Sequence, residues 1–144
     1  MATRATIAKL DKNGVKAIYL HSDGYLEHAG KILDQHYQDE SKVDELLSHG
    51  DVSSLNENIG EKLPFNDYML FHEKKQCRFY HRDRGEDKKE AVTLGGENEL
   101  VKFATEECDA EYIYMFAFGS WYVYDVYNNS EFVELEEVLY IPTR

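Results

Sequence analysis

The N-terminal residues alternate apolar and polar side chains in the pattern of a β-hairpin. Residues 3–10 are rich in β-forming side chains, and residues 15–20 alternate, with Val15, Ala17 and Tyr19 on one side of an extended chain. Between these runs stands DKNG, residues 11–14, in which Asn and Gly tolerate the positive φ of a tight turn. The pattern therefore predicts two strands joined by a short turn.

Helical spacing of apolar residues predicts further helices after the hairpin. They cover residues 25–37, a short stretch between Ser41 and Gly50, residues 97–108 and residues 131–140. Ser22 or Asp23 can cap the first of them, because either side-chain oxygen accepts an otherwise unpaired backbone N–H. Residues 41–44 resemble a capping box, and Gly50 suits the position after a helix end, where a left-handed backbone favours glycine.

More strands are predicted where β-forming residues alternate or run continuously, and these strands decide the fold class. They cover residues 76–81, 91–94, 112–118 and 121–127. Residues 112–118 are apolar on both faces, which is typical of a central strand covered on both sides. Residues 51–72 form a long connection, of a kind that is often functional. Paired strands separated by helices favour a single α+β domain over residues 1–144, with a mostly antiparallel sheet of about five strands and three to four helices.

The charge of the chain narrows the functions that such a domain can have. Its 144 residues include 28 Asp and Glu against 16 Lys and Arg, a formal net charge of −12, and 42% are apolar, enough for a packed core. This charge argues against direct nucleic-acid binding and against attachment to a membrane surface, both of which favour basic proteins. No apolar run reaches the roughly 18 residues of a membrane span, and the charged N-terminus does not fit a signal peptide, so we expect a cytoplasmic protein.

The charge is also unevenly distributed along the chain. Residues 72–89, called the basic segment below, hold seven Lys and Arg against four Asp and Glu, whereas the rest of the chain has a net charge of −15. If this segment is a strand, Arg78, Tyr80 and Arg82 share one face and offer bidentate donors for phosphate and a stacking surface for a base. The alternative is a solvated loop in which Arg82 and Arg84 pair with nearby acids.

A second group of candidate residues stands at the junction between the hairpin and the first helix. There, His21 can act as a general base or ligand with Asp23 orienting it, and the helix N-terminus can receive an anion. The alternative is ordinary turn chemistry and a helix cap. From both groups, the candidate ligand-binding residues are Arg4, His21, Asp23, Tyr25, Arg78, Tyr80, Arg82 and Arg84.

Metal and redox chemistry have little support in the sequence. Cys77 and Cys108 belong to no CxxC pair, so we expect reduced, partly buried side chains. His28 and His36 do not have the spacing of a zinc-binding HExxH motif. We therefore assign no catalytic residue and no metal ligand, and we expect no cofactor.

Several segments of the chain resemble a family of small, mostly uncharacterised accessory proteins of bacteriophages and prophages. They are MATRATI, IYLHSDGYLEHAGKIL, LLSHGDVSSL, FYHRDRGE and GSWYVYDV, of which the parts DGY and RDRGE are the most recognisable. The resemblance runs through most of the chain and transfers no catalytic residue. It implies an accessory protein that acts in the cytoplasm of an infected bacterium, in a class whose small acidic members are often host-takeover or counter-defence factors.

Three functions compete on this basis. The first is a binding protein that sequesters an anionic small molecule, such as a nucleotide signal of host immunity. The second is an acidic inhibitor of a host defence or DNA-binding protein, in which the −15 remainder imitates roughly 25 Å of duplex DNA. The third is a small phosphodiesterase-type hydrolase that uses His21, Asp23 or His81. The alternation of arginine and aromatic residues slightly favours the first, while catalysis and the formation of a homo-oligomer stay open.

Overall fold

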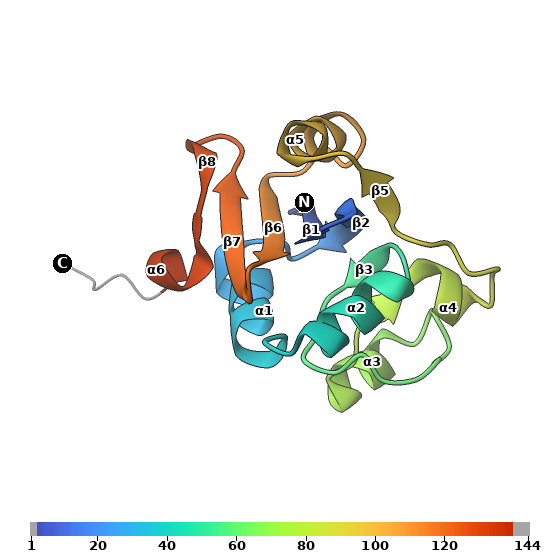
Figure 1. Cartoon of the computed structure of the whole chain (residues 1–144). Coiled ribbons are helices and arrows are strands. Elements are labelled where there is room, and N and C mark those ends of the chain that lie inside the picture. The colour runs from blue at the N-terminus through green and yellow to red at the C-terminus, as the bar shows by residue number, and fades with distance from the viewer. Residues whose placement is uncertain (1–2, 140–144) are drawn as a thin grey trace.

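One mixed β-sheet forms the centre of the computed structural model, which describes residues 3–139 (Figure 1). Its strands are β1 (Ala5–Asp11), β2 (Gly14–Ser22), β3 (Val52–Ser54), β4 (Arg78–Phe79), β5 (Val92–Leu94), β6 (Tyr112–Ala117), β7 (Ser120–Asp125) and β8 (Asn129–Glu134). They lie in the order β4-β3-β2-β1-β6-β7-β8, and β5 pairs with β2 on the same edge as β3. The pairs β1–β6 and β2–β3 are parallel, and the other neighbours are antiparallel.

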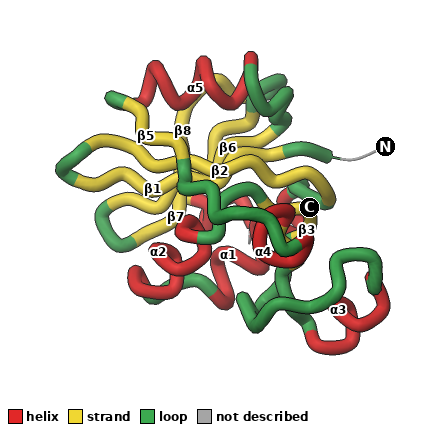
Figure 2. The backbone as a smooth tube through the Cα atoms, turned by 90° about the vertical axis from the view of Figure 1, so that its right-hand side faces the viewer, coloured by secondary structure: helices red, strands yellow, loops and turns green. Residues whose placement is uncertain are grey.

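Helices cover both faces of this sheet. They are a π-helical turn, η1 (Leu26–Gly30), and the α-helices α1 (Lys31–His36), α2 (Glu40–Ser48), α3 (Tyr68–Lys74), α4 (Tyr80–Arg84), α5 (Glu97–Glu106) and α6 (Leu135–Leu139). In Figure 2, α5 lies on one side of the sheet and α1 and α2 lie on the other, while α3 projects away from it. Within the described residues, no helix is long and apolar enough to cross a membrane.

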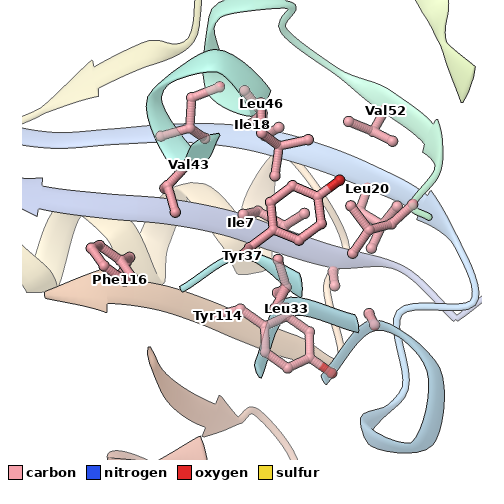
Figure 3. Close-up of a cluster of buried hydrophobic side chains, with 14 of the residues drawn as sticks. Ile7, Ile18, Leu20, Leu33, Tyr37, Val43, Leu46, Val52, Tyr114 and Phe116 are labelled. Carbon is pink, nitrogen blue, oxygen red and sulfur yellow. The ribbon is translucent and has the colours of Figure 1, made fainter. Parts of the chain in front are cut away.

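Alternate residues of the central strands supply two separate cores. Ile7 of β1 faces the helices α1 and α2, whereas its neighbour Ala8 faces α5. In the larger core, Ile7 and Ile18 of the sheet pack among Leu33, Tyr37 and Val43 (Figure 3). Because a strand points successive side chains to opposite faces, a sheet with two apolar faces needs cover on both. This confirms the expectation that residues 112–118 form a central, doubly covered strand.

The structure confirms the α+β class and corrects the size and type of the sheet. The N-terminal hairpin, the helix over 97–108 and the strand pair 112–118 and 121–127 are found close to their predicted bounds. The sheet nevertheless has eight strands in the described chain rather than about five, and it is mixed rather than mostly antiparallel. The described residues also form six α-helices, where three to four helices were predicted. The prediction missed the parallel contact of β1 with β6, because the two strands are about a hundred residues apart and local patterns carry no information on that pairing.

Three element predictions were wrong in their bounds. Residues 51–72, predicted as one long connection, contain β3 and most of α3. Residues 76–81 form a strand only at Arg78–Phe79, after which the chain turns at once into α4. The helix predicted over 131–140 begins at Leu135, because the residues before it pair with β7 as strand β8, and residue 140 lies outside the described residues.

Helix caps also differ from the prediction. Asp39, not Ser41, caps α2 by accepting the Ser41 N–H at 3.0 Å. The first helical turn starts after Tyr25 without a side-chain cap, so neither Ser22 nor Asp23 has the predicted capping role.

Candidate functional site

A tightly fixed turn follows β2 and holds Asp23 in an uncommon conformation. Asp23 has φ of 55°, in the left-handed region. The next residue, Gly24, donates its N–H to the Thr3 carbonyl at 2.8 Å and accepts the Tyr114 hydroxyl at 2.6 Å. A Cβ at position 24 would lie 2.8 Å from the Ala5 Cβ, so only glycine fits there. These contacts fix the backbone that carries Asp23.

This turn borders a cavity of about 380 Å³. The cavity lies where the ends of β2 and β3 meet η1, α3 and β4. Its polar and aromatic lining includes Asp23, His28, Asn56, Tyr68, His72 and Arg78. Ser22, Ser54 and Arg78 lie in one row across β2, β3 and β4, so the sheet register brings Asp23 and Arg78 to the same end of the sheet.

Arg78 is the cation of this cavity, and its side chain is held from several sides. The residue is 6% exposed, and its guanidinium donates from Nε to the Phe65 carbonyl at 2.8 Å and from Nη1 to the Ser53 hydroxyl at 3.2 Å. Its central carbon lies 3.9 Å from the centre of the Phe65 ring and 4.0 Å from that of Tyr68. Nη2 has no hydrogen-bond partner among the described residues, and it is not completely shielded from solvent. Arg78 can therefore donate a further hydrogen bond at the cavity.

Aromatic rings and cations continue beside Arg78 as a cluster around Phe65. The Arg84 guanidinium lies 5.1 Å from the Phe65 ring centre and 4.8 Å from that of Tyr80. The Tyr80 ring in turn contacts Phe65 at 5.8 Å and His21 at 6.4 Å between ring centres. We call Arg78, Phe65, Arg84, Tyr80 and His21 the aromatic–cation cluster. Stacking of cations on rings fixes the relative positions of these side chains.

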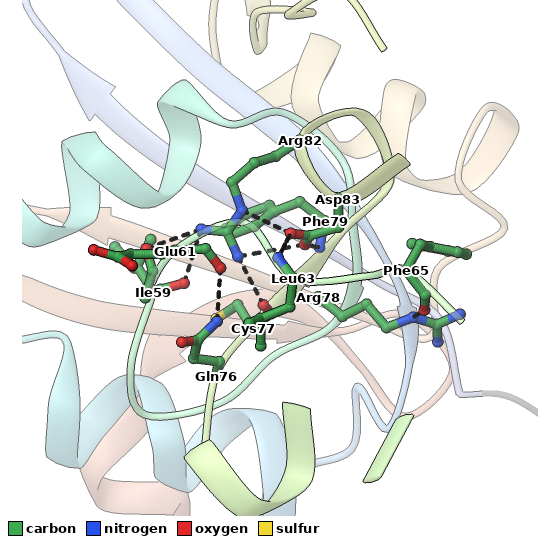
Figure 4. Close-up of polar contacts among 11 residues, drawn as sticks. Ile59, Glu61, Leu63, Phe65, Gln76, Cys77, Arg78, Phe79, Arg82 and Asp83 are labelled. Atoms are coloured by element: carbon green, nitrogen blue, oxygen red, sulfur yellow. Dashed lines mark hydrogen bonds and ion pairs between the residues drawn. The ribbon is translucent and has the colours of Figure 1, made fainter. Parts of the chain in front are cut away.

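Arg82, by contrast, has a structural role. Its guanidinium donates to the carbonyls of Ile59 at 3.0 Å, Gly60 at 3.1 Å and Cys77 at 3.1 Å (Figure 4). It also forms two hydrogen bonds to the Asp83 carboxylate, at 3.1 and 3.3 Å. With these donors occupied, Arg82 holds the loop around residues 59–60 against α4.

Asp83 explains why the chain turns into a helix after two strand residues. Its carboxylate accepts the backbone N–H of Phe79 at 2.7 Å and that of Leu63 at 3.0 Å. The bond to Phe79 satisfies a donor at the start of α4. The predicted row of Arg78, Tyr80 and Arg82 on one strand face is therefore not formed. The ion pairs of the alternative interpretation are found, Arg82 with Asp83 at 3.1 Å and Arg84 with Glu86 at 3.4 Å. They lie in or just after the helix α4, with Asp83 buried, however, and not in a solvated loop.

The structure gathers most of the predicted ligand-binding residues and engages two of them in contacts within the protein. Arg78 and Asp23 line the cavity, and the Tyr25 ring lies 6.0 Å from that of His28, which also lines it. His21, Tyr80 and Arg84 belong to the neighbouring aromatic–cation cluster. Arg82 is occupied within the protein, and Arg4 forms an ion pair with Asp109 at 3.0 Å.

Sequence reasoning missed several side chains of this region, namely Phe65, Tyr68, Met69, Asn56 and His72. All five lie in the predicted connection 51–72, whose unusual length was the one signal that pointed to them. They have no periodic pattern, because the cavity is built from a loop and the first turn of a short helix.

The histidines of the region have neutral partners. His21 Nδ1 lies 2.6 Å from the Tyr19 hydroxyl, and among the described residues no carboxylate bonds to His21. The predicted orientation of His21 by Asp23 is therefore not seen. His28 Nε2 donates to the Leu55 carbonyl at 3.3 Å, since a carbonyl can only accept. No group of three or more His, Cys, Asp or Glu side chains in the described chain is arranged to hold a metal ion.

Both cysteines are free and buried. Burial raises the pKa of the Cys77 thiol, and it raises the pKa of Cys108 to about 11. Both thiols are therefore protonated at neutral pH, as expected for small apolar side chains without a reactive role.

The chain was also compared with protein families, curated proteins and solved structures. No family model matches it, and neither a curated protein nor a solved structure does.

Proposed function

We propose that the protein binds an anionic small molecule with an aromatic ring, such as a nucleotide, in the cavity at the ends of β2 and β3. Arg78 is the observation that carries this proposal. Its guanidinium is buried, hydrogen-bonded and stacked on two rings, and it keeps a terminal nitrogen with no partner in the described part of the chain. A guanidinium fixed in this way can donate to a phosphate with little further loss of side-chain freedom.

The exposed apolar side chains beside Arg78 are evidence that the ligand carries an aromatic ring. Tyr68 and Met69, at the start of α3, line the cavity and are nevertheless 63% and 64% exposed. Large apolar side chains that gather at a concave surface are typical of ligand sites. The cavity volume of about 380 Å³ falls at the lower end of the range of small-molecule pockets, roughly 300–1,000 Å³.

The affinity needed for sequestration sets how many contacts must form. Nanomolar binding requires about 12 kcal/mol. A hydrogen bond to a charged group contributes about 1.5–3 kcal/mol, and a stacked base about 1–3 kcal/mol. Arg78 and Tyr68 are therefore not sufficient alone, and the polar lining from Asp23, His28 and His72 has to take part.

The resemblance to phage accessory proteins suggests what such binding is for. We propose that the protein acts in the cytoplasm of an infected bacterium and counteracts host defence by sequestering a nucleotide immune signal. Binding alone suffices for this role, because a captured signal no longer reaches its receptor.

An acidic inhibitor that imitates DNA has less support from the arrangement of charge. A mimic of duplex DNA needs its acids on one surface. The exposed acids Glu97, Glu99 and Glu106 belong to α5, whereas Glu136 and Glu137 belong to α6, which packs on the opposite face of the sheet (Figure 1). The acids are thus divided between two faces.

Titration calorimetry with a nucleotide panel tests the proposed function. The panel consists of adenosine and guanosine 5′-monophosphates and a cyclic dinucleotide. At least one is expected to bind more tightly than the high micromolar range, and Tyr68→Ala is expected to weaken it about tenfold by removing the stack.

Tyr127→Ala is the matched control, because Tyr127 is 69% exposed and lies in the turn between β7 and β8, outside the cavity lining. Its affinity should equal that of the wild type. The absence of binding across the panel, or equal losses in the two tyrosine variants, would contradict the proposal.

A further inference from the structure

We propose that Asp23 determines the specificity of the cavity by accepting hydrogen bonds from ribose hydroxyl groups. This inference rests on the proposed function and names its ligand class more narrowly, as ribonucleoside phosphates. The observations behind it are the free carboxylate of Asp23, the rigid turn that carries it, and its position relative to Arg78.

The Asp23 carboxylate is available for a ligand. It is exposed, it lines the cavity, and it has no hydrogen bond or ion pair within residues 3–139. Several other aspartates of the fold are engaged by the protein. Asp83 binds two backbone N–H groups and Arg82, Asp109 pairs with Arg4, and Asp44 pairs with Lys9 at 2.6 Å.

The turn that carries Asp23 is fixed by hydrogen bonds to two other parts of the chain. The left-handed φ of 55° costs conformational energy in a residue other than glycine, and such outliers often mark functional sites. Here the neighbouring Gly24 is buried and bonded to Thr3 and Tyr114, two residues of different chain segments. Asp23 is thus presented at the cavity with its backbone already fixed, which lowers the entropic cost of using it in binding.

Arg78 and Asp23, the two charged residues of the cavity, lie far enough apart to bind opposite ends of one ligand. Asp23 directly follows Ser22, which lies in register with Ser54 and, one strand further, with Arg78. Two strand spacings separate the backbones of Ser22 and Arg78 by about 10 Å.

A carboxylate only accepts hydrogen bonds and repels phosphate, so the anionic group of the ligand belongs at Arg78 and its hydrogen-bond donors belong at Asp23. A nucleoside 5′-phosphate has this polarity, because its phosphate and its ribose diol stand at opposite sides of the sugar.

Calorimetry with sugar-modified nucleotides tests this assignment. Adenosine and guanosine 5′-monophosphates are compared with their 2′,3′-dideoxy analogues on the wild type and on Asp23→Asn. Asparagine tolerates the left-handed region, so the turn is kept while the charge is lost. The wild type is expected to prefer the ribonucleotide by about 10- to 100-fold, the equivalent of one or two hydrogen bonds to a charged acceptor. Asp23→Asn is expected to lose most of this preference.

Asp87→Asn is the control, since Asp87 is an exposed aspartate of the basic segment outside the cavity lining, and it should keep the full preference. Equal affinity of the wild type for both sugars overturns the role of Asp23, as does a preference that survives in Asp23→Asn. In both cases the proposed function still holds if a nucleotide binds the wild type and binds Tyr68→Ala more weakly. If the wild type binds none of these monophosphates, the role of Asp23 falls, and the proposed function falls with it only when the cyclic dinucleotide also fails to bind.

Discussion

Arg82 and Asp83 show how adjacent residues of one charged segment can serve the fold rather than a ligand. The Asp83 side chain is fully buried, and that of Arg82 is 13% exposed. Together they satisfy the backbone of α4 and of the loop beside it. Their neighbour Arg78 is also buried but keeps one nitrogen without a partner in the described chain, and this difference separates a structural arginine from a candidate ligand-binding one.

Replacing Asp83 by Asn should therefore destabilise the protein strongly. The change leaves the Arg82 charge without its partner in a buried setting, and such a loss typically costs about 3–5 kcal/mol. Urea denaturation should show this decrease in the free energy of unfolding, with Asp87→Asn, on the exposed part of the same segment, unchanged within about 0.5 kcal/mol. A decrease below about 1 kcal/mol in Asp83→Asn would mean that the network is not what fixes α4.

The elements of this fold were predictable to the extent that their patterns are long and local. The N-terminal hairpin, α5 and the β6–β7 pair have enough residues to show their period. β3 and β4 have three and two residues, too few to show any alternation. At the C-terminal end, Phe132, Leu135 and Val138 have helical spacing, yet Phe132 lies opposite Tyr124 in the sheet, because pairing with β7 outweighs local spacing there.

In the candidate site, too, only the residues with a local sequence signal were predictable. Asp23 and Arg78 were predictable because charged residues in turns and near aromatic residues indicate chemistry without any structure. Phe65 and Tyr68 were not, because their role depends on a loop that folds back onto β4, and no local pattern encodes that contact.

The packing of α2 against β4 has a consequence for stability at mildly acidic pH. His49 ends α2, and its ring lies 4.7 Å from that of Phe79. Burial lowers the pKa of His49 below its ordinary value of 6.5, and the charge of Arg82 lowers it further. Between pH 7 and 5 the unfolded chain therefore takes up a proton at His49 more readily than the folded chain does. The free energy of unfolding should fall as the pH falls through this window.

His49→Gln isolates this contribution. The variant should lose part of the decrease in stability that the wild type shows between about pH 7 and pH 5. Denaturant titrations at several pH values measure both slopes. An unchanged slope in His49→Gln would show that the contact with Phe79 tolerates a charged ring.

The whole molecule combines a net charge of −12 with acids on both faces of the sheet, and this predicts how salt affects its stability. Repulsion among dispersed acids acts over long distances, and it is screened as the Debye length falls from about 30 Å at 0.01 M salt to about 10 Å at 0.1 M. Local ion pairs such as Lys9 with Glu40 and Asp44, at 3.0 and 2.6 Å, lose less because their charges are close and Lys9 is largely buried.

Stability should therefore rise with salt. We expect the melting temperature to increase by about 2–4 °C between these two concentrations, which corresponds to about 1 kcal/mol for a domain of this size. Calorimetric melting in sodium chloride and in potassium fluoride checks that the effect is ionic strength rather than binding of chloride. A lower melting temperature at high salt would mean that ion pairs outweigh repulsion. The acids would then be paired with basic residues in local networks.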